Sequence, residues 1–275
     1  MTSFIRLTDF SKEELFEIFK IADSIENYSD FLKGKTVIMF FPASSIRTRV
    51  TFEKGIYLLG GQVILFDPAT LDKKEDVADV CGYLNNWADA VVVRYKDIQM
   101  LEKMKNAMDI PVINALTDDN HPCEIMADLY TLSKIRKDFL NDKYLFVGED
   151  GNIGRAWKEG SQAFDFSLSQ CCPHKYKMKD VPYIADLKEA VYGKDIICTD
   201  SIPGDDIEAF KPYQVTKGIM ALANKNALLN PCPPFYRGEE VSVDVIDSEY
   251  FVGYEFKKNL LVVQQAIMIY CMTHR

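Results

Sequence analysis

Short apolar strands alternate with helical patterns along most of the sequence, and this order limits the folds that the chain can adopt. Helical spacing is clearest at residues 11–24, where Ser11 and Glu14 form a capping box, and at residues 122–137. Such an alternation predicts parallel sheets that are covered by helices. The predicted strands are residues 37–41, 62–66, 89–93, 111–114, 144–147, 166–170, 195–199 and 227–229.

The length of 275 residues is too great for one ordinary core and predicts two domains. A charged stretch at residues 136–143 separates two similar halves, so we place the domains at residues 1–137 and 138–256. The expected fold class is therefore α/β, with two doubly wound parallel-sheet domains. The last helical pattern, residues 259–270, has an amphipathic spacing.

The composition argues against several kinds of partner. A net charge of −9 disfavours nucleic acid and anionic membrane surfaces. Seven cysteines without paired spacing indicate reduced thiols in a cytoplasmic protein. No group of Cys and His has the spacing of a metal site, and no apolar run approaches the roughly 20 residues of a membrane span. Neither a metal nor a membrane partner is expected.

An anion-binding loop is predicted between the strand 37–41 and the helical pattern that follows Ile46. Free N–H groups and the positive end of the dipole make a helix start attractive to anions. Ser45 and Thr48 add hydroxyl donors, and Arg47 adds a guanidinium that suits phosphate oxygens. A capped surface helix with solvated arginines fits the same residues, because the loop lacks the glycine-rich pattern of a P-loop.

Polar residues also follow other predicted strands, namely Arg94, the segment 121–124 and the segment 148–155. Ligands of open parallel sheets bind beyond the carboxyl ends of the strands, so these residues are candidate contacts. Two alternatives stay open at this point. Arg94 fits a surface ion pair equally well, and His121 fits a helix-start histidine that bonds to backbone.

Taken together, these motifs resemble those of the aspartate/ornithine carbamoyltransferase family. Residues 45–49 (Ser-Ile-Arg-Thr-Arg) resemble its Ser-Thr-Arg-Thr-Arg carbamoyl-phosphate loop, and residues 121–124 (His-Pro-Cys-Glu) its His-Pro-Cys-Gln motif. Residues 90–94 resemble the strand that delivers another ligand-binding arginine. Residues 147–155 resemble the start of the acceptor domain, and residues 230–233 the His-Cys-Leu-Pro segment. The resemblance covers nearly the whole chain.

The resemblance implies two α/β domains, the first for carbamoyl phosphate and the second for an amino-acid-like acceptor. The final helix, about 257–275, is expected to return to the first domain. In the implied reaction, an amine attacks the carbonyl carbon of carbamoyl phosphate and phosphate leaves, without a cofactor. A cytoplasmic homotrimer with active sites between subunits is also implied.

The resemblance assigns a role to each candidate residue. The catalytic group is Arg47, Thr48, Arg94 and His121. The phosphate contacts are Ser45, Arg47, Thr48 and the backbone N–H of Ile46; the carbonyl oxygen contacts are Thr48, Arg94 and His121; the carbamoyl NH₂ contacts are Glu124 and the carbonyls of Pro231 and Cys232. Lys73 would reach a neighbouring subunit, and Asn152 and Arg155 would bind the acceptor. Each of three assignments has an alternative. Lys73 fits a solvated lysine, Arg155 fits a solvent-facing arginine, and Pro231–Cys232 fit a merely rigid Pro-rich loop.

Four residues depart from the family pattern: Ile46, Glu124, Asn230 and Leu260. Ile46, Glu124 and Leu260 keep open the alternative of a catalytically impaired member that binds carbamoyl phosphate or acts as a regulatory protein. The motifs favour an ornithine-type acceptor, although Arg155 leaves an aspartate-type acceptor possible.

A glycine pattern at residues 148, 151 and 154 leaves a dinucleotide-binding enzyme as another alternative. Its spacing differs from the G-x-G-x-x-G fingerprint, and no clear ribose-binding acid follows a second strand.

Overall fold

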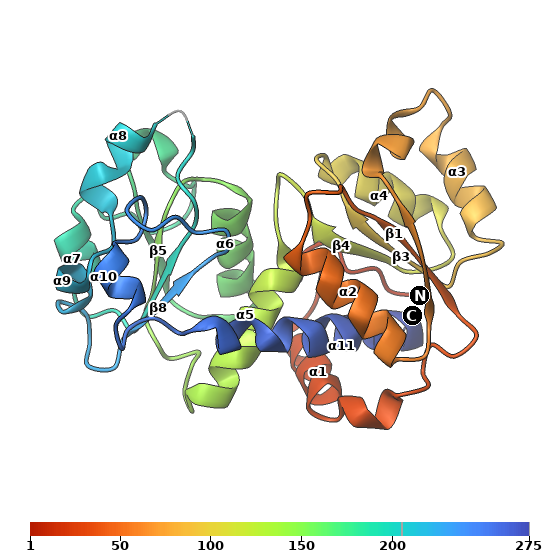
Figure 1. Cartoon of the computed structure of the whole chain (residues 1–275), viewed down its shortest axis with the longest axis horizontal. Coiled ribbons are helices and arrows are strands. Elements are labelled where there is room, and N and C mark those ends of the chain that lie inside the picture. The colour runs from red at the N-terminus through yellow and green to blue at the C-terminus, as the bar shows by residue number, and fades with distance from the viewer. Residues whose placement is uncertain (205, 275) are drawn as a thin grey trace. The chain divides into compact units, whose positions relative to one another are not determined.

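The computed structural model describes residues 1–204 and 206–274, which form two compact units (Figure 1). The first unit is Met1–Thr131 with Lys257–Arg275, and the second is Leu132–Phe256. The division lies within α5 (Pro122–Ile135), whereas the expected domains meet at residue 137. Each unit contains one four-stranded parallel sheet with helices on both faces, as the sequence predicts.

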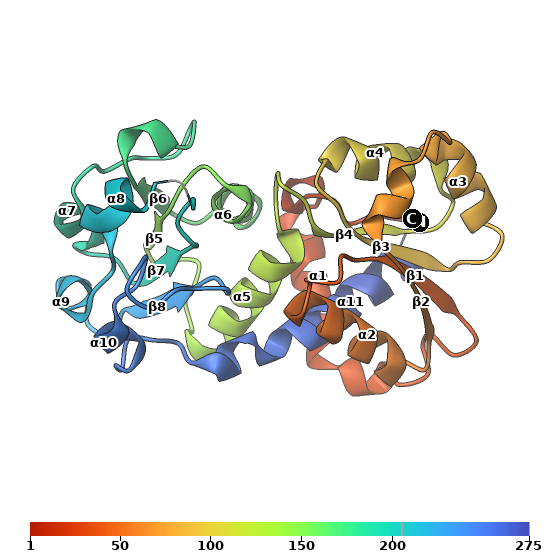
Figure 2. The same ribbon diagram turned by 45° about the horizontal axis from the view of Figure 1, so that its top comes forward.

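The first unit has a sheet with the strand order β2-β1-β3-β4. One face is covered by α3 and α4, where Val91 and Val93 pack with Leu101 and Met104, and the other by α1, α2 and α11 (Figure 2). The strands are β1 (Thr36–Phe40), β2 (Gln62–Phe66), β3 (Ala90–Arg94) and β4 (Val112–Leu116). The helices are α1 (Lys12–Asp23), α2 (Arg47–Leu58), α3 (Val77–Leu84), α4 (Ile98–Ala107) and α11 (Leu260–Thr273), with 3₁₀ turns at η1 (Leu7–Asp9), η2 (Ile25–Tyr28), η3 (Pro68–Asp72) and η6 (Tyr254–Asn259).

The second unit repeats this order as β6-β5-β7-β8. Aromatic packing of Tyr144 on Trp157 joins α6 to one face, and the opposite face packs against α7, α9 and α10 through residues such as Leu145 and Ile197. The strands are β5 (Tyr144–Val147), β6 (Leu168–Cys171), β7 (Ile196–Thr199) and β8 (Leu228–Pro231). The helices are α6 (Asn152–Phe164), α7 (Leu187–Val191), α8 (Ile207–Phe210), α9 (Lys217–Met220) and α10 (Val243–Ile246), with η4 (His174–Tyr176) and η5 (Lys211–Tyr213).

The strand order fixes where a ligand can approach each unit. In both sheets the first strand of the unit lies centrally, beside the third strand. The connections that follow these two neighbouring strands therefore cross to opposite faces of the sheet. The carboxyl ends of such a pair form the crevice in which doubly wound sheets bind ligands. In the first unit this pair is β1 and β3, and in the second it is β5 and β7.

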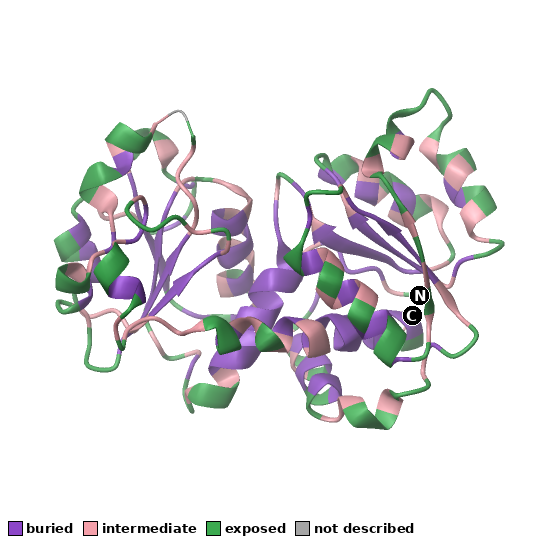
Figure 3. Cartoon of the chain, in the orientation of Figure 1, coloured by how far each residue is buried: buried purple, intermediate pink, exposed green. Residues whose placement is uncertain are grey.

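The final helix returns to the first unit, as the resemblance implies, but it is not amphipathic. All residues from Val263 to Met272 are buried, and most of α11 is coloured as buried in Figure 3. The helix lies against α1 and α2, and the Gln265 Nε2 donates to the Gly55 carbonyl at 2.9 Å. A Cβ at Gly55 would lie 3.0 Å from the Gln265 Cγ, so the two helices approach closely there. The amphipathic interpretation was wrong because packing covers the helix on every side.

Among the helices of the described part of the chain, none combines the length and the apolar character needed to cross a membrane.

Candidate active site

The loop after β1 brings two hydroxyls into the interior at the start of α2. Ser45 and Thr48 are buried, while the side chain of Ile46 is 71% exposed. Ile46 is the N-cap residue of α2 and has no side-chain atom that can cap the helix. The first backbone N–H groups of α2 are therefore open toward a ligand, and Arg47 is the first residue of the helix.

Arg94 meets this loop from the adjacent strand. The register of β3 against β4 shifts between Val93 and Arg94, at the end of the strand. The Arg94 Nη1 donates to the Ser45 Oγ at 3.0 Å. Burial, followed by the charge of Arg47, lowers the pKa of the Arg94 guanidinium. Two mutually repelling cations at a crevice favour an anion between them.

His121 precedes α5 and is 5% exposed. Burial lowers its pKa to about 4, although Glu124 acts in the opposite direction, and the charges of Arg94 and Lys257 lower it further. Its Nδ1 has no hydrogen-bond partner among the described residues. The imidazole is therefore neutral near neutral pH, with one ring nitrogen left for a ligand.

A buried network holds the loop that leads to His121. The Asn114 Nδ2 donates to the Asn120 Oδ1 at 2.6 Å, and the Thr117 Oγ1 donates to the same oxygen at 3.1 Å. The Cys123 thiol donates to the Asn114 carbonyl at 3.3 Å. These hydrogen bonds limit the movement of the loop that leads to His121.

Glu124 lies in the first turn of α5 and faces a cation that sequence reasoning missed. The Lys257 Nζ is 2.8 Å from the Glu124 Oε1 and 2.6 Å from the Asp128 Oδ1. The available signal was the pair of acids four residues apart in the helix predicted at residues 122–137, because two such acids need a cation when they are buried. We call Ser45, Arg47, Arg94, His121 and Glu124 the strand-end cluster; hydrogen bonds and charge interactions link its members within the first unit.

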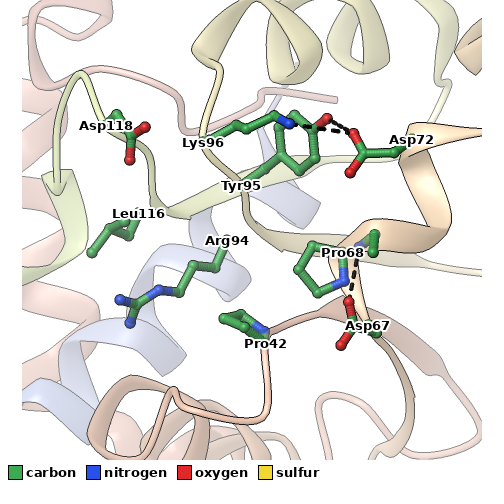
Figure 4. Close-up of a pocket in the computed structure, with 10 residues that line it drawn as sticks. Pro42, Asp67, Pro68, Asp72, Arg94, Tyr95, Lys96, Leu116 and Asp118 are labelled. Atoms are coloured by element: carbon green, nitrogen blue, oxygen red, sulfur yellow. Dashed lines mark hydrogen bonds and ion pairs between the residues drawn. The ribbon is translucent and has the colours of Figure 1, made fainter.

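A pocket of about 320 Å³ opens beside the strand-end cluster (Figure 4). Arg94 lines it, with the guanidinium pointing away from Asp67 and Asp72. Asp72 already accepts from the Tyr95 hydroxyl and lies 3.7 Å from the Lys96 Nζ.

Lys73 follows η3 and is exposed. Within residues 1–204 and 206–274, no hydrogen bond or ion pair joins it to the cluster.

The second unit places Asn152 and Arg155 in the first turn of α6. Arg155 folds back: its Nε donates to the Gly151 carbonyl at 3.3 Å and lies 3.7 Å from the Asp150 Oδ1. Burial raises the pKa of the neighbouring Glu149, and the charge of Arg155 acts in the opposite direction. Arg155 is therefore one cation among carboxylates at the end of β5.

The glycine pattern of this loop has a packing reason. A Cβ at Gly154 would lie 2.7 Å from the Glu149 carbonyl oxygen and 2.8 Å from a ring carbon of Phe146. Only glycine allows α6 to approach the end of β5 this closely. The spacing that suggested a dinucleotide site therefore needs no dinucleotide.

Pro231 and Cys232 are buried at the end of β8, beside β7. The Cys232 N–H donates to the Thr199 carbonyl at 2.9 Å. Glu240 holds the following segment, because its Oε1 accepts from the Tyr236 N–H at 2.6 Å. Burial raises the pKa of Glu240 to about 7, and Asp200 is among the charges that act on it.

Comparisons with known proteins agree across the whole chain. The family model for the aspartate/ornithine carbamoyltransferase carbamoyl-P binding domain matches residues 2–134, and the model for its Asp/Orn binding domain matches residues 141–271. The chain is 34% identical to an ornithine carbamoyltransferase of Hydrogenovibrio crunogenus, over 98% of this chain and 97% of the relative.

Solved structures give the same result. An ornithine carbamoyltransferase from Pyrococcus furiosus has a TM-score of 0.93 at 26% identity, covering 99% of this chain and 97% of that one. The enzyme from Burkholderia thailandensis has a TM-score of 0.92 at 27% identity and covers 99% of both chains. Together with the two parallel sheets, these matches define the class of protein as a transferase built from two α/β units.

The chain belongs to the aspartate/ornithine carbamoyltransferase family. It is a carbamoyltransferase, an enzyme that transfers the carbamoyl group of carbamoyl phosphate to an amino acid.

Proposed function

We propose that the enzyme carbamoylates the side-chain amine of an ornithine-type acceptor, and that the strand-end cluster binds carbamoyl phosphate. The amine nitrogen attacks the carbonyl carbon, the bond from that carbon to the phosphate oxygen breaks, and the amine loses a proton. The observation that carries this proposal is the approach of Arg94 to Ser45, with Arg47 beside them at an open helix start. Positioning and charge stabilisation supply the catalysis.

Each residue of the donor half has a proposed part. Ser45, Arg47, Thr48 and the N–H of Ile46 bind the phosphate, and Arg94 with His121 polarises the carbonyl oxygen. Glu124 accepts from the carbamoyl NH₂, as do the backbone carbonyls of Pro231 and Cys232. The hydroxyl lost at Ile46 weakens the phosphate site without removing its backbone donor.

Acidic residues at the ends of β5 and β7 favour a cationic acceptor. Glu149, Asp150 and Asp200 lie there, and Glu240 interacts electrostatically with Asp200. A second ammonium group, as in an ornithine-type amino acid, complements this charge better than the second carboxylate of aspartate. Asn152 and Arg155 would hold the amino-acid end of the acceptor. Domain 138–256 is accordingly proposed as the acceptor domain and domain 1–137, with about 257–275, as the carbamoyl-phosphate domain.

An acceptor panel tests the function, with the ureido product measured after incubation with carbamoyl phosphate. Turnover with basic amino acids supports the proposal; turnover with aspartate alone would assign the other branch. The alternative of a catalytically impaired regulator finds no support in the comparisons, and binding of carbamoyl phosphate without any ureido product would revive it.

Asn152→Ala with Arg155→Ala should raise the acceptor KM by about tenfold to a hundredfold, because a charged hydrogen bond contributes about 1.5–3 kcal/mol. The affinity for carbamoyl phosphate should stay unchanged. Lys158→Ala is the matched control. Lys158 lies farther along α6, and its Nζ donates to the Lys179 carbonyl. An unaltered acceptor KM in the double variant would remove both residues from the acceptor site.

A trimer is part of the proposal. The edge strand β2 exposes Ile64 and Phe66, and α2 exposes Val50 and Tyr57, which suits contact with other copies of the chain. Lys73, close to this edge in sequence, would then reach a neighbouring subunit. A cytoplasmic location fits seven cysteines that are all buried and unbridged.

Phe66→Lys with Ile64→Lys should convert a trimer into monomers, measured as molar mass by light scattering. Charged side chains on an edge strand oppose association. Tyr192→Lys is the control, because Tyr192 is 79% exposed but lies in the second unit. A trimeric double variant would place the contact elsewhere, and a monomeric wild-type protein would end the proposal for Lys73.

A further inference from the structure

Two buried carboxylates share one ammonium group behind the strand-end cluster. Glu124 and Asp128 lie one turn apart on α5 and are 5% and 2% exposed. The Lys257 Nζ lies 2.8 Å from the Glu124 Oε1 and donates to both oxygens of Asp128, at 2.6 and 2.8 Å. Lys257 comes from η6, just before α11, and its side chain is 20% exposed.

Such an arrangement is costly unless the charges compensate one another, since each buried ion loses several kcal/mol of hydration. Glu124 is faced by Lys257 from η6, by His121 from the start of α5, and by Arg47 from α2. Burial opposes the charge of Glu124, but these groups together bring its pKa below the ordinary value. Lys257 itself is faced by Glu124 and Asp128.

We propose that Lys257 is a positioning residue of the carbamoyl-phosphate site, which keeps Glu124 ionised and oriented so that it accepts from the carbamoyl NH₂. The inference rests on the proposed function of the strand-end cluster. An ionised carboxylate only accepts hydrogen bonds, whereas a protonated one donates through its O–H. An amide at the same position would accept without a neighbouring cation, so the need for Lys257 follows from the acid at residue 124.

Lys257→Met should therefore impair the enzyme through Glu124. We expect kcat/KM for carbamoyl phosphate to fall about a hundredfold near neutral pH, because the buried carboxyl takes up a proton. The activity should return as the pH rises through the new, higher pKa of Glu124. Glu124→Gln is the reference variant without a titrating acid at this position, and its kcat/KM should show no new inflection with pH, since an amide accepts from the carbamoyl NH₂ and has no proton to gain. Lys257→Arg keeps the positive charge, so its kcat/KM should show no new inflection with pH.

The double variant Glu124→Gln with Lys257→Met decides the question. Its kcat/KM for carbamoyl phosphate should lie within about tenfold of that of Glu124→Gln. Its pH profile should lack the new inflection, because the amide at residue 124 has no proton to gain. A double variant as impaired as Lys257→Met, or a Lys257→Met enzyme with wild-type kcat/KM and pH profile, would overturn the proposal. Lys258→Met, in the same 3₁₀ turn but exposed, is the control.

The failure of this inference is separable from the failure of the proposed function. If the wild-type enzyme forms no ureido product with any acceptor, the function fails first. The affinity of each variant for carbamoyl phosphate, measured by titration at several pH values, then takes the place of kcat/KM in the comparison. Thermal unfolding of each variant identifies one that does not fold, in which case Lys257→Arg and the double variant carry the test.

Discussion

Arg47→Ala is expected to lower the affinity for carbamoyl phosphate by about a thousandfold, which corresponds to about 4 kcal/mol. Arg47 is the first residue of α2, and its charge acts on Arg94, so the two cations are proposed to bind the same anion. Charge-assisted, bidentate contacts to phosphate are among the strongest polar interactions in proteins. Isothermal titration with carbamoyl phosphate measures the loss.

The sequence offers a matched control two residues away. The Arg49 Nε donates to the Glu53 Oε1 at 2.7 Å along α2, in a partly exposed ion pair. Arg49→Ala should leave the affinity within about twofold, because the loss of such a pair costs only about 0.3–0.5 kcal/mol of stability. Equal effects of Arg47→Ala and Arg49→Ala would mean that general charge, and not the loop, attracts the ligand.

His121→Ala should lower kcat by about a hundredfold to a thousandfold, or about 2.7–4 kcal/mol, as expected when a donor to a developing oxyanion is removed. The affinity for carbamoyl phosphate should change less, because the main contacts with the phosphate remain. Steady-state kinetics with both substrates separates the two effects. His174→Ala, an exposed histidine of the second unit, should have no such effect.

The pH profile gives a second test of His121. Because burial lowers its pKa to about 4, the imidazole stays neutral across the assay range, and kcat should show no inflection near the ordinary value of about 6.5. The unfolded chain binds this proton more readily, so the residue also makes the fold less stable as the pH falls from about 6.5 toward 4. A kcat inflection near 6.5 that disappears in His121→Ala would contradict a neutral donor.

The meeting of Arg94 with Ser45 was predictable because both residues lie at the ends of neighbouring strands. A strand end determines where Ser45 and Arg94 point, and neighbouring strands bring them together. Lys257 was not predictable in this way, since its contact with Asp128 joins residues 129 positions apart. Arg155 illustrates a different limit. Its position in α6 was expected, but its bend toward Asp150 depends on a local charge that a motif does not encode.

The burial of α11 on every side has a consequence for biosynthesis. The first unit is closed by a helix that the ribosome makes only after the whole second unit. Nascent domains usually fold in the order of synthesis. Here the contiguous second unit is complete first, while the amino-terminal segment waits with apolar surfaces of α1 and α2 uncovered, which makes it a natural client for chaperones until α11 emerges.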